Sequence, residues 1–268
     1  MNKLNELNKA KDGDQGCFVG FVLLSEAKWD KGAFLERLAA EWAISPAEYV
    51  DRAAADNQDA EAEELVFEED GLLAAVSLMP AAVPNREAEE NAANNYLWPE
   101  AAAAAASHKA HLLVAVMGGE AVRRGELFVK LAAVCAGLPE ALGVYTSGTV
   151  FGPKMYREFA EVMREGELPL LNWVWFGLYQ DEKGLGGYTY GLAPFGKAEI
   201  EVLPAADNQP EPDELRSFLM DMAYYVLSQD VTLQDGETIG FSEEQKLPIT
   251  RSAGVALPGE TLKIPYFA

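Results

Sequence analysis

The stretch ELVFEEDGLLAAVSLMP, residues 64–80, holds two short apolar segments on either side of Asp70 and Gly71. An Asp-Gly pair between two such segments is a strong signal for a two-residue hairpin turn. Pro80 ends the second segment, because proline cannot donate to a strand ladder. These residues predict an antiparallel hairpin, and the flanking segments decide what kind of sheet contains it.

The residues before this hairpin predict one strand and one helix. CFVGFVLL (17–24) is a continuous apolar run of the strand type. Phe34 and Leu38 then recur at helical spacing, and Asp30 stands where a helix N-cap belongs. Residues 41–70 hold eleven acidic side chains against one basic one, which predicts a solvated loop or an exposed helix before the hairpin.

The residues after the hairpin predict one helix and one strand. Asn85 is placed to cap a helix, and Pro99 either kinks that helix or starts a second one. HLLVAVMGG (111–119) again reads as a strand. The order strand, helix, strand, strand, helix, strand is that of the split βαβ unit of a ferredoxin-like sandwich.

The rest of the chain repeats this order, with a second long hairpin and a helix that begins near Pro212. This helix carries one apolar stripe, formed by Leu215, Phe218, Leu219, Met222 and Val226. We therefore expect an α+β fold of two ferredoxin-like (split βαβ) halves in tandem, with antiparallel sheets and helices packed on one face. The expected parts are a first half over 15–119, a helical connector over 120–140, and a second half with extra C-terminal strands over 141–268.

The chain of 268 residues carries a formal net charge of −22, spread evenly along its length. Such a field repels phosphate backbones and anionic lipids, so we expect neither nucleic acid nor membrane as a partner. It would attract a basic protein or a cationic ligand, although the charge can also serve solubility alone. The polar start predicts no signal peptide, and Cys17 and Cys135 in apolar settings predict buried thiols in the cytoplasm.

The two histidines of the chain, His108 and His111, are candidate catalytic residues, with Glu87 or Glu90 as an acid–base partner. A zinc site would need at least three ligands, so we expect no metal here. Packing at a helix-to-strand junction is the other interpretation. It places His108 partly exposed at a helix end and His111 buried in a strand, with its pKa lowered.

Two further groups of polar and aromatic residues are candidate ligand-binding residues. Three asparagines and a tryptophan within one predicted helix form either a binding face or a buried hydrogen-bond network. Alternation in the second hairpin predicts an aromatic wall that could stack a flat or cationic ligand, or that simply belongs to a covered sheet. The candidates are Asn94, Asn95 and Trp98 in the first group, and Trp173, Trp175, Tyr188 and Tyr190 in the second.

No nucleophile, phosphate-loop, dinucleotide or paired-cysteine motif occurs in the chain, and we expect no cofactor. The phrases MPAAVPN, HKAHLLVAV and DGETIGFS, at 79–85, 108–116 and 235–242, resemble a bacterial family of unknown function, domain of unknown function 4261. The resemblance runs from residue 21 to residue 267. It implies no catalytic residues, and an immunity-like role beside secreted toxins is its only functional suggestion.

Two functions remain open on the sequence alone. The first is a non-enzymatic, acidic binding protein of the bacterial cytoplasm that engages a basic protein partner, as the charge and the missing catalytic motifs suggest. The second is an enzyme or small-molecule sensor that uses a cleft between the two halves, with the histidines as acid–base groups and the aromatic wall for stacking.

Overall fold

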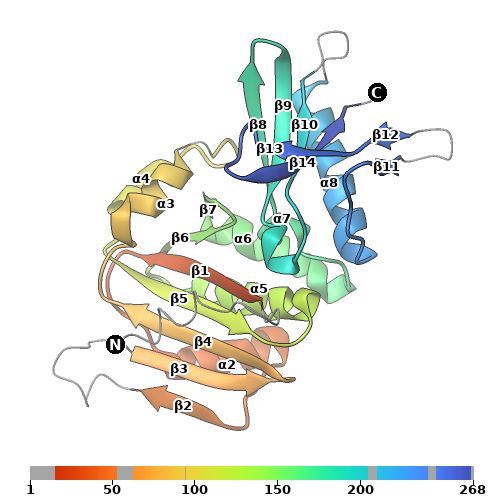
Figure 1. Cartoon of the computed structure of the whole chain (residues 1–268). Helices are drawn as coiled ribbons and strands as arrows, with labels where there is room; N and C mark the ends of the chain where they lie inside the picture. Colours follow the sequence, from red (N-terminus) through yellow and green to blue (C-terminus); the bar gives the residue numbers. More distant parts are fainter. Residues whose placement is uncertain (1–15, 53–62, 94, 205–209, 241–245, 267–268) are drawn as a thin grey trace. The chain divides into compact units, whose positions relative to one another are not determined.

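The computed structural model describes residues 16–52, 63–93, 95–204, 210–240 and 246–266 (Figure 1). Its chain divides into two compact units, residues 1–160 and residues 161–268. Each unit has its own sheet and its own helices, and each is described by itself.

Unit 1 contains a seven-stranded sheet in the order β2-β3-β4-β5-β1-β6-β7, in which every neighbouring pair is antiparallel. Its strands are β1 (Cys17–Leu24), β2 (Tyr49–Arg52), β3 (Glu63–Glu69), β4 (Leu72–Met79), β5 (Ala110–Met117), β6 (Ala141–Thr146) and β7 (Thr149–Phe151). Its helices are α2 (Lys31–Trp42), η2 (Pro84–Arg86), α3 (Glu87–Ala92), α4 (Ala101–Ser107), α5 (Ala121–Ala136) and α6 (Pro153–Ala160).

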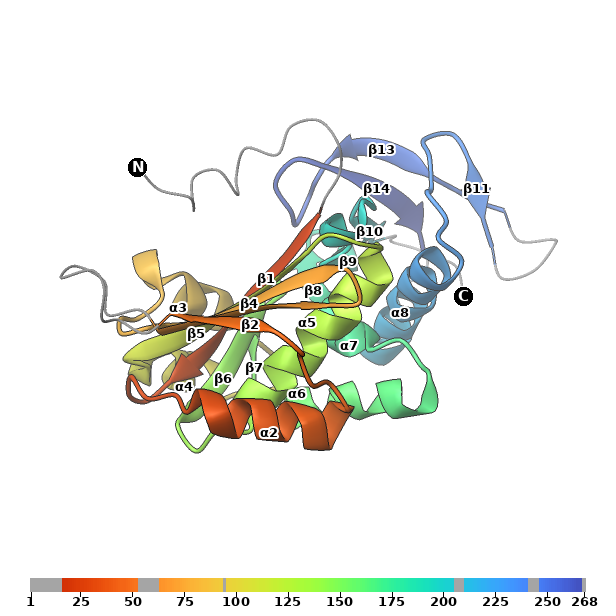
Figure 2. The same ribbon diagram turned by 90° about the horizontal axis from the view of Figure 1, so that it is seen from below.

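One face of this sheet packs against α5, which lies beside α2 (Figure 2). Phe18 and Gly20 of β1 point to this face, and the ring centroid of Phe18 lies 5.9 Å from that of Phe128 in α5. A Cβ atom at position 20 would come within 2.7 Å of the Phe128 ring. Glycine at this position therefore lets the helix approach the central strand closely.

The opposite face is covered at one end by α3 and α4, whose alanines pack against Leu23, Tyr145 and Val150. The expectation that helices pack on one face only is therefore wrong. Alanine is the residue type that makes this possible, because its small side chain lets a short helix lie close to a sheet. Phe21, next to Leu23 on the same strand, is partly buried against this cluster.

The strand order does not confirm the tandem ferredoxin-like halves. In a split βαβ unit β1 would lie between β4 and β5, whereas here β5 lies between β4 and β1. β6 and β7, which we expected to open the second half at residue 141, extend the first sheet beyond β1. The expected connector at 120–140 is α5, the main covering helix of that sheet. The coarser expectation, a mixed α+β chain with antiparallel sheets, is confirmed.

Unit 2 contains a five-stranded sheet in the order β13-β14-β10-β9-β8 and a small two-stranded sheet of β11 and β12. Its strands are β8 (Trp175–Asp181), β9 (Gly184–Tyr190), β10 (Ile200–Leu203), β11 (Thr238–Ile239), β12 (Leu247–Pro248), β13 (Thr250–Ala253) and β14 (Glu260–Pro265). Its helices are η3 (Glu161–Glu165), α7 (Leu170–Trp173), η4 (Ala193–Phe195) and α8 (Pro212–Ser228). β10 and β14 pair in parallel, and the other pairs are antiparallel.

α8 forms the core of unit 2 with one face of the five-stranded sheet. The apolar stripe expected on this helix is buried, with Leu215 and Leu219 fully enclosed. A Cβ atom on Gly187 of β9 would lie 2.8 Å from a methyl group of Leu219. The helix therefore rests directly on the strand backbone.

Local signals near the first hairpin were confirmed with one exception. Asp30 caps α2 by accepting a hydrogen bond from the Ala33 amide, and Asp70 and Gly71 form the turn between β3 and β4. Asn85 does not cap α3, because it lies in the left-handed region at φ 57° and Arg86 occupies the N-cap position. No helix in the described part of the chain is long and apolar enough to cross a membrane.

Both cysteines carry free thiols. Cys135 is buried in α5, and this burial raises the pKa of its thiol. Cys17 is half-buried in β1, and burial also raises its pKa, although the nearby Arg124 lowers it. Both shifts reduce the thiolate character on which the reactivity of a cysteine nucleophile depends.

Candidate functional site

His108 is a buried structural residue and not the partly exposed helix end that the sequence suggested. Only 5% of it is exposed. Its Nε2 atom accepts a hydrogen bond from the backbone amide of Val83 at 2.8 Å, and its Nδ1 atom contacts the carbonyl of Ala105. A backbone group therefore occupies each of the two ring nitrogens.

His111 lies in β5, as expected, and is also held to the backbone. Its Nδ1 atom lies 2.8 Å from the carbonyl of Ala81, and its ring contacts Phe21 edge-on at 5.3 Å. Burial lowers its pKa, the bond to Ala81 raises it, and His108 lowers it further, so the neutral form is favoured. The two imidazoles thus fix the segment that follows β4 to the end of α4 and to β5.

The glutamates expected to assist these histidines have other positions. Glu87 accepts a hydrogen bond from the Tyr145 hydroxyl at 2.7 Å, and Asn91 donates to the same hydroxyl at 3.1 Å. Glu90 is exposed in the first turn of α3. The partners of both imidazoles in the described part of the chain are backbone groups, so the contacts do not assemble an acid–base pair with either carboxylate.

Asn95 is the centre of a buried network between the α3–α4 connection and the sheet. Its amide donates to the Val150 carbonyl at 2.7 Å and to the Thr149 hydroxyl at 3.2 Å. Its side-chain oxygen accepts from the amides of Leu97 and Trp98. These bonds match the interpretation of a network that holds the helix onto its sheet, and they leave little of Asn95 for a ligand.

Trp98 and Asn94 complete this group. The Trp98 ring packs over Gly152, where a Cβ atom would lie 3.5 Å from the indole, and it is partly buried against the α3–α4 cluster. Asn94 lies outside the described residues. Among the residues that are described, no group of three or more His, Cys, Asp or Glu side chains is arranged to hold a metal ion.

Three of the four aromatic candidates share one face of the unit 2 sheet. Trp175 pairs across the strands with Tyr190, and Tyr188 lies opposite Gly177. Tyr190 is 42% exposed, Tyr188 is half-buried and Trp175 is buried. Trp173 does not continue this alternation, because it ends α7 and packs against Phe195 at 4.9 Å.

Glycines position the tyrosine rings on this face. A Cβ atom at Gly177 would meet the Tyr188 ring at 2.1 Å, and one at Gly186 would meet the Tyr179 ring at 2.4 Å. Each ring therefore lies flat across a glycine of the neighbouring strand. Burial, with smaller contributions from Glu201 and Asp181, raises the pKa of Tyr179 to about 12.

A buried ion pair on the same face was missed by the sequence analysis. Lys263 and Glu201 are 2.9 Å apart, and Glu201 is fully buried. Burial raises the pKa of Glu201, but the amides of residues 255–257 and the Lys263 ammonium outweigh it, and the net pKa is lowered. The Glu201 carboxylate accepts hydrogen bonds from the amides of residues 255–257 and so fastens this loop to β10. Glu201 and Lys263 are brought together by the pairing of β10 with β14, which the sequence did not predict.

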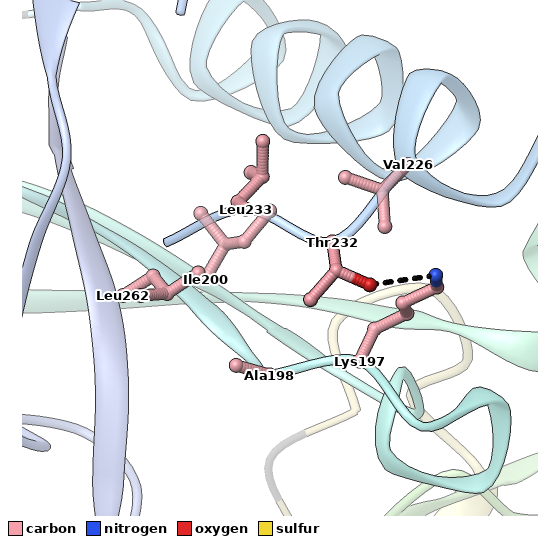
Figure 3. Close-up of a pocket in the computed structure, with 7 residues that line it drawn as sticks. All are labelled: Lys197, Ala198, Ile200, Val226, Thr232, Leu233 and Leu262. Atoms are coloured by element: carbon pink, nitrogen blue, oxygen red, sulfur yellow. Dashed lines mark hydrogen bonds between the residues drawn. The ribbon is translucent and has the colours of Figure 1, made fainter. Parts of the chain in front are cut away.

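A small pocket in unit 2 lies between β10, α8 and the residues that follow α8 (Figure 3). Its one charged lining residue is Lys197, whose ammonium donates to Asp230 at 2.7 Å and to Thr232 at 3.1 Å. The cavity volume is about 10 Å³, which is about the space that one water molecule needs. The pocket is therefore too small for a substrate or cofactor.

Unit 1 has exposed apolar residues on the part of its sheet that α3 and α4 leave open. Cross-strand pairing places one apolar residue of each of five adjacent strands in a single row. We call this row, with Leu73 beside it, the open face: Val50, Val66, Ala75, Ala115, Val19 and Leu73. Val50, Val19 and Leu73 are 53%, 47% and 42% exposed.

Acidic side chains border the open face on β3. Glu64 and Glu68 flank Val66 on the same side of the strand, and Glu68 is exposed. An exposed apolar area with a polar border is typical of an interaction surface. The apolar segments of β1, β3, β4 and β5 were visible in the sequence, but the row depends on β5 lying between β4 and β1, which the sequence did not reveal.

Comparison with known proteins is consistent with one part of the sequence analysis. Residues 188–265 match the model of a family described as Domain of unknown function (DUF4261). The resemblance to this family is confirmed over that range, which lies within unit 2. No curated protein and no solved structure matches the chain.

Proposed function

We propose that this chain, whose residues 188–265 carry the family domain DUF4261, is a non-enzymatic binding protein that engages a basic protein partner in the cytoplasm. The observation that carries the proposal is the open face of unit 1, with its exposed Val19, Val50 and Leu73 and its acidic border. Partially exposed apolar area supplies affinity on docking, and the surrounding charge selects the partner and speeds the encounter.

The positions of the titratable candidates support binding over catalysis. His108 and His111 each bond to backbone groups, and the Glu87 carboxylate accepts from a tyrosine of the sheet. A general acid or base must reach a substrate proton, and both imidazoles are buried inside the fold. The net charge of −22 favours a partner of opposite sign.

A pull-down with paired variants tests this proposal. Val19→Glu/Leu73→Glu places charge on the open face at exposed positions, and Val162→Glu/Tyr225→Glu makes the same change at exposed positions of unit 2. We expect wild type and the unit 2 variant to retain one basic protein at low salt, and the open-face variant to lose it. An acidic or neutral partner, or equal retention by both variants, would contradict the proposal.

A second candidate function uses the aromatic face of unit 2 as a small-molecule site. Tyr190 is 42% exposed beside Trp175, and the hydroxyl of Tyr179 is buried without a hydrogen-bond partner in the described part of the chain. Aromatic faces bind organic cations, and a negative field would favour them. Quenching of tryptophan fluorescence by an aromatic quaternary ammonium, lost in Tyr190→Ala, would support this function over the first.

A further inference from the structure

β2 is the outermost strand of the unit 1 sheet, and its outer edge has no neighbouring strand within the described part of the chain. Its residues Tyr49 and Val50 are 51% and 53% exposed, and they point to opposite faces of the sheet. In a strand paired on one side, half of the N–H and C=O groups point away from the partner. β2 therefore presents an open hydrogen-bonding edge with an accessible side chain on each face.

Two other outer strands, β7 and β13, each have a backbone group that bonds to a side chain. β7 is buried, and the Val150 carbonyl accepts a hydrogen bond from the Asn95 amide at 2.7 Å. On β13 the Arg251 amide donates to the Asp235 carboxylate at 2.7 Å. The ion pair of Asp51 with Lys31 engages a side chain of β2 and not its backbone. Within the described part of the chain, β2 differs in this respect from β7 and β13.

The charge around this edge selects what can pair with it. β2, the residue before it and β3 carry six acidic side chains against the single basic Arg52. A second copy of the chain would bring the same carboxylates opposite one another, and like charges across paired strands are destabilising. An extended segment with lysine or arginine would meet them with opposite charge. The acidic residues are Glu48, Asp51, Glu63, Glu64, Glu68 and Glu69.

We propose that β2 is a recognition strand, which binds an extended basic segment of the partner as an additional strand of the sheet. Main-chain hydrogen bonds to the open edge would supply affinity, and alternate side chains would supply specificity. On the face of the sheet that carries Val50, side chains of the bound segment would continue the apolar row of the open face. We therefore expect the segment to alternate apolar residues, which point to this face, with basic residues. This inference rests on the proposed function and adds to it the mode of recognition.

The probe is a synthetic peptide of alternating lysine and valine, about ten residues long to match an ordinary strand. Binding to the full chain is measured by fluorescence anisotropy at low salt, and amide hydrogen exchange is followed at residues 49–52. We expect the peptide to protect these amides. The same peptide, N-methylated at every second residue so that one edge cannot donate, should bind at least about tenfold more weakly.

Charge variants distinguish binding at β2 from attraction of the peptide by the overall negative charge of the molecule. Glu48 and Glu68 are exposed beside the strand, and Glu165 and Glu182 are exposed in unit 2. Glu48→Lys/Glu68→Lys should strongly lower the affinity of the chain for the peptide. Glu165→Lys/Glu182→Lys makes the same change in net charge and should leave this affinity within about twofold at moderate salt. Equal weakening by both pairs would overturn the recognition strand.

The outcomes distinguish this inference from the function on which it rests. Binding without protection of residues 49–52, or with no effect of N-methylation, overturns strand pairing but leaves a basic partner in place. If the chain forms concentration-dependent dimers in which the same amides are protected, then a second copy of the chain, and not a basic segment, pairs with β2. If neither this peptide nor any other basic probe binds at low salt, the proposed function fails as well.

Discussion

His108 connects two backbone segments that are far apart in the sequence, and its removal should lower the stability of the fold. In His108→Ala the Val83 amide loses its acceptor inside the protein, and a buried donor without a partner costs about 1–3 kcal/mol. We expect the free energy of unfolding in urea to fall by about that amount.

Lys109→Ala is the matched control, because Lys109 is the next residue and its side chain is exposed. It should change the unfolding free energy by less than about 0.5 kcal/mol. If His108→Ala were as stable as this control, the imidazole would not be the structural link that its two contacts imply.

His111 should make the stability of the protein depend on pH below its ordinary pKa of 6.5. Burial lowers the folded pKa, so the unfolded chain binds the proton more strongly. The stability contribution of the neutral ring is complete above pH 6.5 and is lost as the pH falls from there towards the folded pKa. His111→Gln keeps a donor for Ala81 but does not titrate.

Urea midpoints measured at about pH 7.5 and about pH 5.5 test this sign, because only histidines among ordinary side chains titrate between these values. Wild type should lose more stability than His111→Gln over this interval. An equal loss in both proteins would assign the pH dependence to other groups.

These two histidines also show what the sequence reveals at the scale of single residues. The burial of His111 followed from alternation along one strand, and the lowered pKa followed from burial. The burial of His108 could not be predicted, because its partner Val83 lies 25 residues away in a segment with no regular pattern. Contacts between segments depend on packing, which local periodicity does not encode.

At the scale of elements, Asn95 joins the α3–α4 connection to the edge strand β7. Asn95→Ala removes the bonds to Thr149 and Val150 and also those from the amides of the connection. We expect a loss of about 3 kcal/mol, since several buried groups lose their partners together. Amide exchange in β7 should accelerate before exchange in the central strands does.

Asn95→Asp serves as the comparison, because it keeps the oxygen that accepts from Leu97 and Trp98 and loses the donor to Val150. It should accelerate exchange in β7 while leaving the connection ordered. If both variants left β7 protected, the strand would be held by packing alone and not by this amide.

The sequence predicted most elements and none of the long-range strand order. The apolar runs of β1 and β5, the Asp70-Gly71 turn and the stripe of α8 are local patterns, and all were confirmed. β2 was missed because a four-residue strand within an acidic section has little periodicity. The position of β5 between β4 and β1 was also missed, because both arrangements bury the same apolar residues. The open face depends on that order, so it could not be predicted either.

At the scale of the whole molecule, the net charge of −22 should make the folded state sensitive to salt. Charges of one sign repel each other more in the compact state than in the unfolded chain. Raising NaCl from about 0.02 M to about 0.5 M shortens the Debye length severalfold. We therefore expect the urea midpoint to rise with salt, while binding of a basic partner weakens.

The variant Glu165→Lys/Glu182→Lys provides the control for this prediction. Each substitution replaces a negative charge with a positive one, so the two together change the net charge from −22 to −18. The rise of the urea midpoint with added salt should be smaller for the variant than for wild type. An equal gain would mean that salt acts through hydration of apolar surface and not through screening of this charge.

The central place of β1 in its sheet has a consequence for how the protein is made. β1 leaves the ribosome before any other strand of the sheet, yet its two neighbours are β5, which ends at Met117, and β6, which ends at Thr146. At an elongation rate of about 5–20 residues per second, this apolar strand remains without either partner for about 5–20 s. During that interval it is a natural target for the chaperones that meet nascent chains, and its exposure would be longest when translation pauses before β5 is complete.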